Sequence, residues 1–460
     1  MGTGTRARTR RSGEARPARS RRQRSNAHQA GGTRPAPSAP AAPGGDGPPG
    51  GPVPAPRPLS RVGRVGPFQL RQLVLVELAL ALAAVGVALG GMWMVLTSVV
   101  AVVLLLVAVA RRRGQALQDW AATALALRAR RRAAEPAAAD ADPSLAPIAE
   151  GLPGFRPFPY VDRKRRTVGM LGDGSFLTAV VRVEASGAAP RPAFGARSLP
   201  LSLLGGALEV DDIVLESVQL VQQVRSAPAP HLPQQAVARL SYVPLQERTG
   251  APALRMTWVA LKLDPERCRE AIEARGGGVE GAQRCLVRAA DHVASRITGA
   301  GFEAVVLDQE ELNSTMATAA CASPRLAARA HRPDATPQRR TVETARVWRC
   351  DDRWHTTYAV GRWPDLGPGG AGTPLAGLVS LLTATPAHAT TFSLALHRGA
   401  RQGAVDVAGY VRITGGSDTE LIGVRRALEQ AARSAKVGLV RLDREQLPGV
   451  VATLPLGGTQ

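Results

Sequence analysis

Two pairs of carboxylates are the side chains in this sequence whose type and spacing best suit chemistry. Asp308 and Glu310 follow one expected strand, and Asp443 and Glu445 follow another strand of similar sequence. Carboxylates at the end of a strand often line a catalytic or binding pocket. Acidic side chains in this position also cap and stabilise the helix that follows. Because the arrangement occurs twice, we favour helix capping and keep catalysis as the alternative.

The motifs of familiar enzyme classes are missing. No Gly-Lys dipeptide occurs, so the chain has no Walker A loop and is not a P-loop ATPase. It also has no HExxH motif and no GxSxG elbow, and no GxGxxG follows an expected strand. The four cysteines, none at zinc-site spacing, are expected to be buried and reduced: Cys268, Cys285, Cys321 and Cys350. We therefore predict a protein that is not an enzyme and has no cofactor or bound metal.

One long apolar segment predicts a membrane anchor. Residues 73–110 contain a single charged side chain, and a membrane-spanning helix needs about 20 residues. Dividing the segment at the adjacent Gly90 and Gly91 gives two spans, 73–89 and 92–110. Arginines stand at both ends, so the positive-inside rule predicts that both chain termini are cytoplasmic at a bacterial inner membrane.

Gly86 and Gly90 form a small-residue motif, GxxxG, in the first predicted span. Such spacing allows two helices to approach closely in a membrane. The sequence leaves three explanations open: contact with a partner helix, contact within the hairpin, and chance, because glycine is common in membrane spans.

The formal net charge of +21 is concentrated beside the apolar segment. Residues 1–72 contain 14 arginines and two acidic residues, and residues 111–134 contain seven arginines and one aspartate. Basic flanks of this kind favour anionic lipid headgroups as partners. Because the charge does not cover the folded part of the chain, we predict no nucleic-acid partner.

The regions around the predicted spans differ in composition. Residues 1–60 are rich in Arg, Pro and Gly and are predicted to be a disordered tail. Residues 61–72 form a basic juxtamembrane segment. Residues 111–158 are predicted to contain a basic helix, able to continue the second span along the membrane surface, and then a linker.

The rest of the chain predicts an α/β (α+β) cytosolic domain with a possible duplication. Residues 159–320 and 341–456, joined by a linker at 321–340, each predict the element order ββαββαβ. In the second unit Ser417 and Glu420 form a capping box at the start of a helix. We expect two sheets, each covered by helices and packed side by side. The alternative is that ordinary α/β patterning imitates a repeat.

Three features together resemble the EccE family, the membrane component of the actinobacterial type VII (ESX) secretion system. These are the hairpin at 73–110, the segment VGMLGDGSFLTAV at 168–180, and the segment RWHTTYAVGRWP at 353–364. The layout is similar over about residues 61–456. The long Arg- and Pro-rich tail departs from the family pattern.

The resemblance implies a non-catalytic membrane subunit that contributes to the assembly or stability of an inner-membrane secretion complex. Its partners would be EccB, EccC and EccD-like subunits, with EccC supplying ATP hydrolysis, which agrees with the missing Walker motif. The alternative is a membrane-tethered transferase that acts on envelope or lipid precursors at the inner leaflet through Asp308 or Asp443.

Overall fold

The computed structural model describes residues 64–458 with several gaps. The gaps are 66–67, 110, 113–114, 138–141, 153, 164, 186–197, 227–234, 238–239, 242–243, 245–253, 333–335, 337, 365–373 and 400–403. The tail predicted at 1–60 lies outside the described residues.

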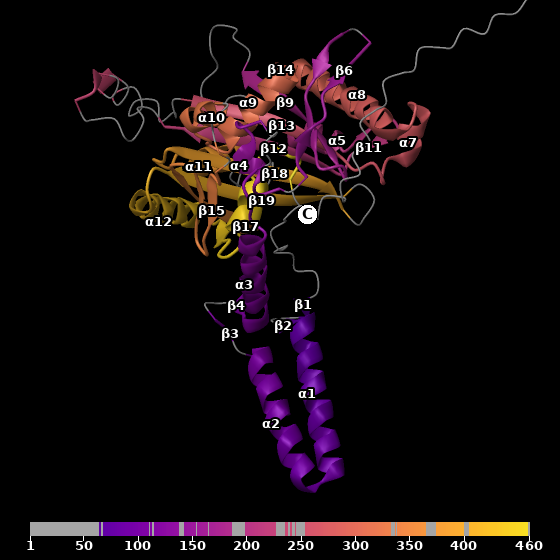
Figure 1. Ribbon diagram of the computed structural model, residues 1–460, viewed down its shortest axis with the longest axis vertical. Helices are drawn as coiled ribbons and strands as arrows, with labels where there is room; N and C mark the ends of the chain where they lie inside the picture. The colour runs from indigo at the N-terminus through magenta and orange to yellow at the C-terminus, as the bar shows by residue number, and fades with distance from the viewer. Residues whose placement is uncertain are drawn as a thin grey trace, which may run out of the picture. The chain divides into compact units, whose positions relative to one another are not determined.

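Two helices, α1 (Leu70–Leu89) and α2 (Gly91–Val109), form a hairpin where the sequence predicted one (Figure 1). Gly90 and Gly91 make the turn with φ of 63° and 58°, a left-handed conformation that glycine adopts without strain. Small buried residues, among them Ala79, line the contact between the helices. In the described part of the chain, no helix has both the length and the apolar character needed to cross a membrane.

Helix α3 (Leu117–Arg132) contains the predicted basic segment. It is not a continuation of α2, because the short strands β3 (Arg111–Arg112) and β4 (Gln115–Ala116) separate the two helices. A similar short pair, β1 (Arg64–Val65) and β2 (Phe68–Gln69), precedes α1.

One sheet of 12 strands forms the centre of the α/β domain, where the sequence analysis predicted two sheets. Its principal order is β15-β16-β17-β19-β18-β12-β13-β9-β8-β5, with β14 paired to β9 and β20 paired to β17. The strands are β5 (Arg156–Pro157), β8 (Met170–Gly172), β9 (Leu177–Ala185), β12 (Ser217–Arg225), β13 (Leu254–Leu263), β14 (Phe302–Val306), β15 (Thr341–Glu343), β16 (Trp348–Cys350), β17 (Arg353–Arg362), β18 (Ala389–Arg398), β19 (Val405–Gly415) and β20 (Gly438–Arg441).

The two predicted units meet at the antiparallel pair β12 and β18, which runs from Ser217 opposite His397 to Val224 opposite Thr390. On one side of this pair β9 is bonded to β8, β13 and β14, and on the other side β17 is bonded to β16, β19 and β20. The same connectivity therefore occurs twice around the central pair. Pairing β12 with β18 satisfies backbone groups that two separate sheets would leave at their edges, which explains why a single sheet forms.

Helices cover both faces of this sheet, so the α/β class is confirmed. One core lies under α5 (Leu201–Gly206), α8 (Gly278–Gly299), α11 (Leu375–Thr383) and α12 (Asp418–Ser434). The other lies under α4 (Ala146–Ala149), α9 (Gln309–Ala319) and α13 (Gln446–Val451). The remaining elements are α7 (Arg269–Ala274), α10 (Pro324–Ala330), the pair β6 (Tyr160–Val161) and β7 (Thr167–Val168), and the pair β10 (Glu209–Val210) and β11 (Ile213–Val214).

The last described residues lie buried against the central strands. The Gln219 side-chain oxygen accepts hydrogen bonds from the backbone N–H groups of Leu456 and Gly457 at 3.1 and 2.8 Å. Residues 450–458 are all buried. This segment therefore links the C-terminal end of the described chain to β12 in the first unit.

Candidate interaction site

The first pair of predicted site residues lies at the start of α9. Asp308 is the N-cap residue, and its carboxylate accepts a hydrogen bond from the Glu311 backbone N–H at 2.8 Å. The Glu311 carboxylate in turn accepts a hydrogen bond from the Asp308 backbone N–H at 3.4 Å, which completes a capping box. Glu310 lies in the first turn and is exposed. These carboxylates satisfy and stabilise a helix terminus.

The second pair lies after β20. Asp443 accepts two hydrogen bonds from the Arg441 guanidinium at 2.6 and 2.9 Å, and this contact raises the pKa of Arg441. Glu445 holds the N-cap position of α13, and its side chain makes no cap hydrogen bond. Seven strand-to-strand steps separate β14 from β20 in the sheet, so the two pairs lie in different parts of it. They do not form one catalytic site.

The predicted GxxxG residues have different environments. A Cβ atom at Gly86 would lie 1.8 Å from the Thr97 hydroxyl of α2, so this glycine allows close contact within the hairpin. Gly90 has no neighbour within 4 Å of its Cβ position and serves the turn. Of the three explanations left open by the sequence, contact within the hairpin is the one that this geometry fits.

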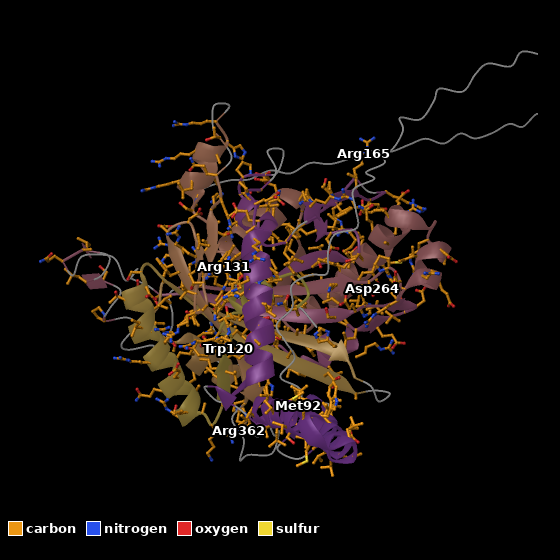
Figure 2. All side chains as sticks on the ribbon, turned by 60° about the horizontal axis from the view of Figure 1, so that its bottom comes forward. Met92, Trp120, Arg131, Arg165, Asp264 and Arg362 are labelled. Atoms are coloured by element: carbon orange, nitrogen blue, oxygen red, sulfur yellow. The ribbon has the colours of Figure 1, made fainter. Side chains whose placement is uncertain are left out.

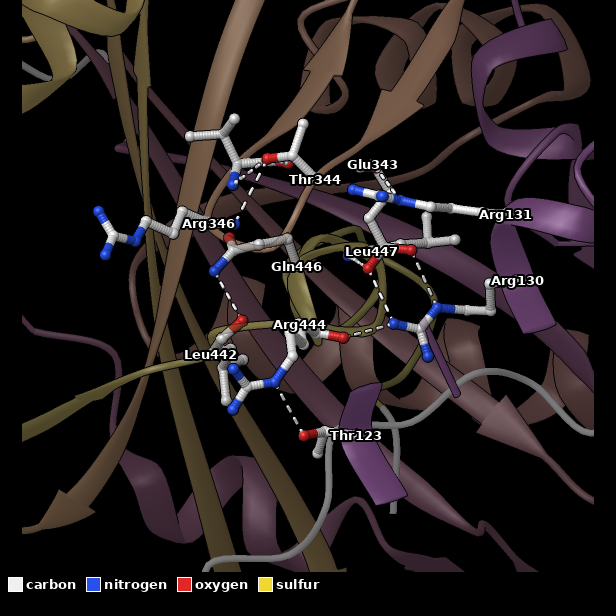
Figure 3. Close-up of polar contacts among 11 residues, drawn as sticks. Thr123, Arg130, Arg131, Glu343, Thr344, Arg346, Leu442, Arg444, Gln446 and Leu447 are labelled. Carbon is white, nitrogen blue, oxygen red and sulfur yellow. Dashed lines mark hydrogen bonds and ion pairs between the residues drawn. The ribbon is translucent and has the colours of Figure 1, made fainter. Parts of the chain in front are cut away.

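A dense set of polar contacts between distant segments joins α3 to the second unit (Figure 3). Arg130 donates from Nε and Nη2 to the two carboxylate oxygens of Glu343 in β15, at 3.0 and 2.9 Å. The Glu343 side chain is 4% exposed and the Arg130 side chain 20% exposed. A forked arginine–carboxylate pair is stronger and geometrically more specific than a surface ion pair, so it holds α3 in one position on the domain.

Glu343 also connects α3 with α13. Its Oε1 accepts a hydrogen bond from the Leu447 backbone N–H at 3.1 Å, and its backbone carbonyl accepts one from Arg131 Nε at 2.9 Å. One residue of β15 thus contacts two helices. We call Arg130, Arg131, Glu343, Arg444 and their partners the α3 junction.

Arg444 adds a second set of contacts to the α3 junction. Its carbonyl accepts a hydrogen bond from Arg130, its Nε donates to the Thr123 hydroxyl at 3.2 Å, and its guanidinium lies 5.0 Å from the centre of the Trp120 ring. Its φ is 68°, a left-handed value that is uncommon for a residue with a side chain. Such a conformation persists when surrounding contacts hold it, and the contacts of Arg444 are of that kind.

The spacing of side chains on α3 explains why one face docks. Thr123, Leu127 and Arg130 recur at intervals of four and three residues, which places them on one side of a helix; the first two are buried. Arg128 and Arg132 are exposed. Trp120 and Arg131 mark the two ends of this helix in Figure 2.

No sequence motif marks the α3 junction. Arg444 stands between the two carboxylates of the second predicted pair, and Glu343 belongs to a three-residue strand with no distinguishing motif. The only signal was the excess of arginines after the apolar segment.

Residues 251–360 match the family model described as "EccE: Putative type VII ESX secretion system translocon, EccE". This stretch of the chain is similar to EccE. The chain is 32% identical over 145 residues to the ESX-1 secretion system protein EccE1 of Mycobacterium tuberculosis, a match that covers 29% of each chain. It is 30% identical over 144 residues to EccE1 of Mycolicibacterium smegmatis, a match that covers 28% of each chain.

These matches confirm the resemblance predicted from the sequence. The match covers under a third of the length of these curated relatives. The stretch matched by the EccE family model includes β13, α7, α8, β14, α9 and most of β17. It therefore contains Glu343 but neither Arg130 nor Arg444, the other principal members of the α3 junction.

Proposed function

We propose that this protein is a non-catalytic membrane subunit of a type VII (ESX) protein secretion complex, and that it contributes to the assembly or stability of that complex. The observation that carries the proposal is the EccE match over residues 251–360. The positions of Asp308 and Asp443 in capping and ion-pair contacts agree with a role that is not catalytic.

We propose that the α1–α2 hairpin anchors the chain in a bacterial inner membrane with both termini cytoplasmic. The support is the sequence of 73–110 and the outward apolar side chains of both helices. Val87 of α1 and Leu106 of α2, for example, are 70% and 61% exposed. So large a continuous apolar surface needs a lipid or protein environment, and the basic flanks suit anionic headgroups.

The α3 junction has a specific part in this proposal. Because α3 follows the hairpin closely in the chain, its attachment to β15 and α13 would transmit the orientation of the anchor to the α/β domain. If the domain is held in one orientation relative to the anchor, each copy of the subunit presents its surfaces to neighbouring subunits in the same way. We propose EccB-, EccC- and EccD-like subunits as those neighbours.

Co-purification at native abundance tests the proposal. The tag belongs at the N-terminus, because residues 450–458 are buried. We expect a P-loop secretion ATPase and a multi-span membrane protein to be recovered at fixed stoichiometry after extraction in mild detergent. Recovery of the protein alone, or with enzymes of lipid or envelope synthesis, would reject the assembly role.

Substitution of the carboxylates separates assembly from transferase activity. Asp308→Asn keeps a good N-cap residue while removing the charge, and Asp443→Asn changes the second pair in the same way. Secretion at the wild-type level in both variants is expected of an assembly subunit. A loss of secretion by a correctly folded Asp308→Asn protein would favour an enzyme.

A further inference from the structure

Arg412 of β19 is a fully buried arginine on the sheet face that α9 covers. Its Nη2 donates hydrogen bonds to the Ala319 carbonyl and, at 3.3 Å, to the Thr391 hydroxyl. Its Nε and Nη1 have no hydrogen-bond partner among the described residues. A guanidinium has five N–H donors and stays charged in proteins, so this side chain retains unused donors and a full positive charge.

A second arginine lies at the same end of α9. Arg225 of β12 donates from Nη2 to the Thr318 carbonyl at 3.1 Å, and its Nε has no partner in the described part of the chain. The carbonyl end of a helix offers a partial negative charge of about one half. Two guanidinium groups exceed that charge, so the end of α9 balances only part of it.

No carboxylate among the described residues compensates for Arg412. Burial lowers the pKa of Arg412, Cys321 and Cys350 oppose this effect, and the guanidinium of Arg225 adds to it. Burial raises the pKa of Cys350 well above its ordinary value, so this thiol is neutral at physiological pH. The side-chain oxygens of Gln223 and Thr357, in the same row across the strands, are also without partners, but they are uncharged.

His355 of β17 faces the same layer. The backbone register places Arg412 opposite Thr357 and His355 opposite Thr414, so His355 and Arg412 are diagonal neighbours. Burial, and then the charge of Arg412, lowers the pKa of His355 well below its ordinary value, so the ring is neutral. Its Nδ1 lies 3.0 Å from the Thr414 hydroxyl, and its Nε2 has no described partner. With the proton on Nε2, this ring is another unused donor.

We propose that Arg412, with His355 Nε2 as a further donor, binds a small inorganic anion of the size of chloride. Buried charges in proteins are normally paired, and the described side chains around Arg412 supply no negative partner. Diagonal neighbours on adjacent strands are about 7–8 Å apart, and both side chains are fully buried, which suits a monatomic ion between them better than a nucleotide or a lipid phosphate. Arg412 bonds α9 of the first unit to β19 of the second, so the anion stabilises the contact between the two units.

Thermal unfolding of the full chain in detergent tests this site. Unfolding temperatures are compared in sodium chloride and in sodium gluconate at equal ionic strength, because gluconate is too large to enter. We expect a higher unfolding temperature in chloride for the wild type. Arg412→Met, which keeps much of the side-chain length and loses the charge, should show the same temperature in both salts. Arg362→Met, at an exposed position, should respond like the wild type.

Bromide quenching provides a readout that does not require the Arg412 variant to fold. The Trp348 ring lies 5.1 Å from the His355 ring, so a bromide bound at His355 would quench the fluorescence of this tryptophan. Saturable quenching that Trp348→Phe removes supports the site. Equal unfolding temperatures in the two salts, together with quenching that rises only linearly with bromide, would overturn the proposal and indicate that water occupies these donors.

Discussion

Removal of Arg130 should detach α3 from the α/β domain. Arg130→Met keeps a good helix former with a similar aliphatic stem, but it leaves the Glu343 carboxylate, 4% exposed, without its counter-ion. Breaking a fully buried pair costs about 3–5 kcal/mol. Because Arg130 is 20% exposed, water screens part of the interaction, and we take the lower end, about 3 kcal/mol.

A loss of this size has a measurable kinetic consequence. About 3 kcal/mol corresponds to a factor of roughly 100 in the equilibrium between the docked and detached helix. We expect the amide hydrogens of α3 to exchange about 100-fold faster in Arg130→Met, measured by hydrogen exchange in detergent under conditions where exchange follows the opening equilibrium. The strands β12 and β18, which do not contact Arg130, should exchange at the wild-type rate.

Two variants control this experiment. Arg128→Met removes an exposed arginine of the same helix and should change exchange by less than a factor of two. Adding Glu343→Gln to Arg130→Met removes the uncompensated carboxylate, so it should restore part of the lost protection. Equal exchange in Arg130→Met and Arg128→Met would refute the reasoning, because the ion pair would then contribute nothing to docking.

Four further outcomes are expected. Gly86→Leu should separate α1 from α2 by overpacking against Thr97, at a cost of about 1–3 kcal/mol. The loss should be detectable as faster amide hydrogen exchange across the hairpin, and Gly86→Ala should have a smaller effect. Asp308→Ala should destabilise α9 by about 1 kcal/mol and Asp308→Asn by much less, as measured by chemical denaturation. Gln219→Leu should leave the N–H group of Gly457 unpaired at a cost of about 1–3 kcal/mol, detected as proteolysis of the C-terminal segment, whereas the Leu456 N–H keeps its hydrogen bond to the Leu454 carbonyl. Burial raises the pKa of Cys285 to about 11, so maleimide should label it at least about 100-fold more slowly than an ordinary cysteine at pH 8. Because the thiol of the unfolded chain loses its proton at a lower pH than the buried thiol, the free energy of unfolding should fall as the pH rises above about 9.

Local sequence signals indicated several of the helices and turns. The predicted spans at 73–89 and 92–110 correspond closely to α1 and α2, because a continuous apolar segment favours helix and the Gly90-Gly91 pair permits the turn. The predicted N-cap residue Ser417 is confirmed: its hydroxyl accepts a hydrogen bond from the Glu420 N–H at 3.1 Å. The reciprocal half of the predicted capping box differs, because the Glu420 carboxylate accepts from the Gly416 N–H at 2.7 Å. Such features depend on residues a few positions apart, so one stretch of sequence contains all the information that they need.

The arrangement of the sheet depended on the tertiary structure. The partners in the β12–β18 pair are 166 to 180 residues apart in the chain. Strand signals indicate that each segment is extended but not which neighbour it bonds, because every exposed strand edge offers the same backbone groups. The order ββαββαβ predicted for each unit recurs in the strands and helices around the central sheet, whereas the predicted division into two sheets was wrong.

The candidate sites show the same division between local and distant information. Asp308 and Glu310 could be selected because a carboxylate after a strand is a local pattern. Arg130 and Glu343 are 213 residues apart, and Arg412 resembles any other strand arginine until α9 covers it. Whether a charge is paired, and whether it is buried, depends on the atoms that folding brings around it. By itself the sequence determined the helices, their caps and the hairpin, whereas only the tertiary structure decided which charges meet and which are enclosed without a partner.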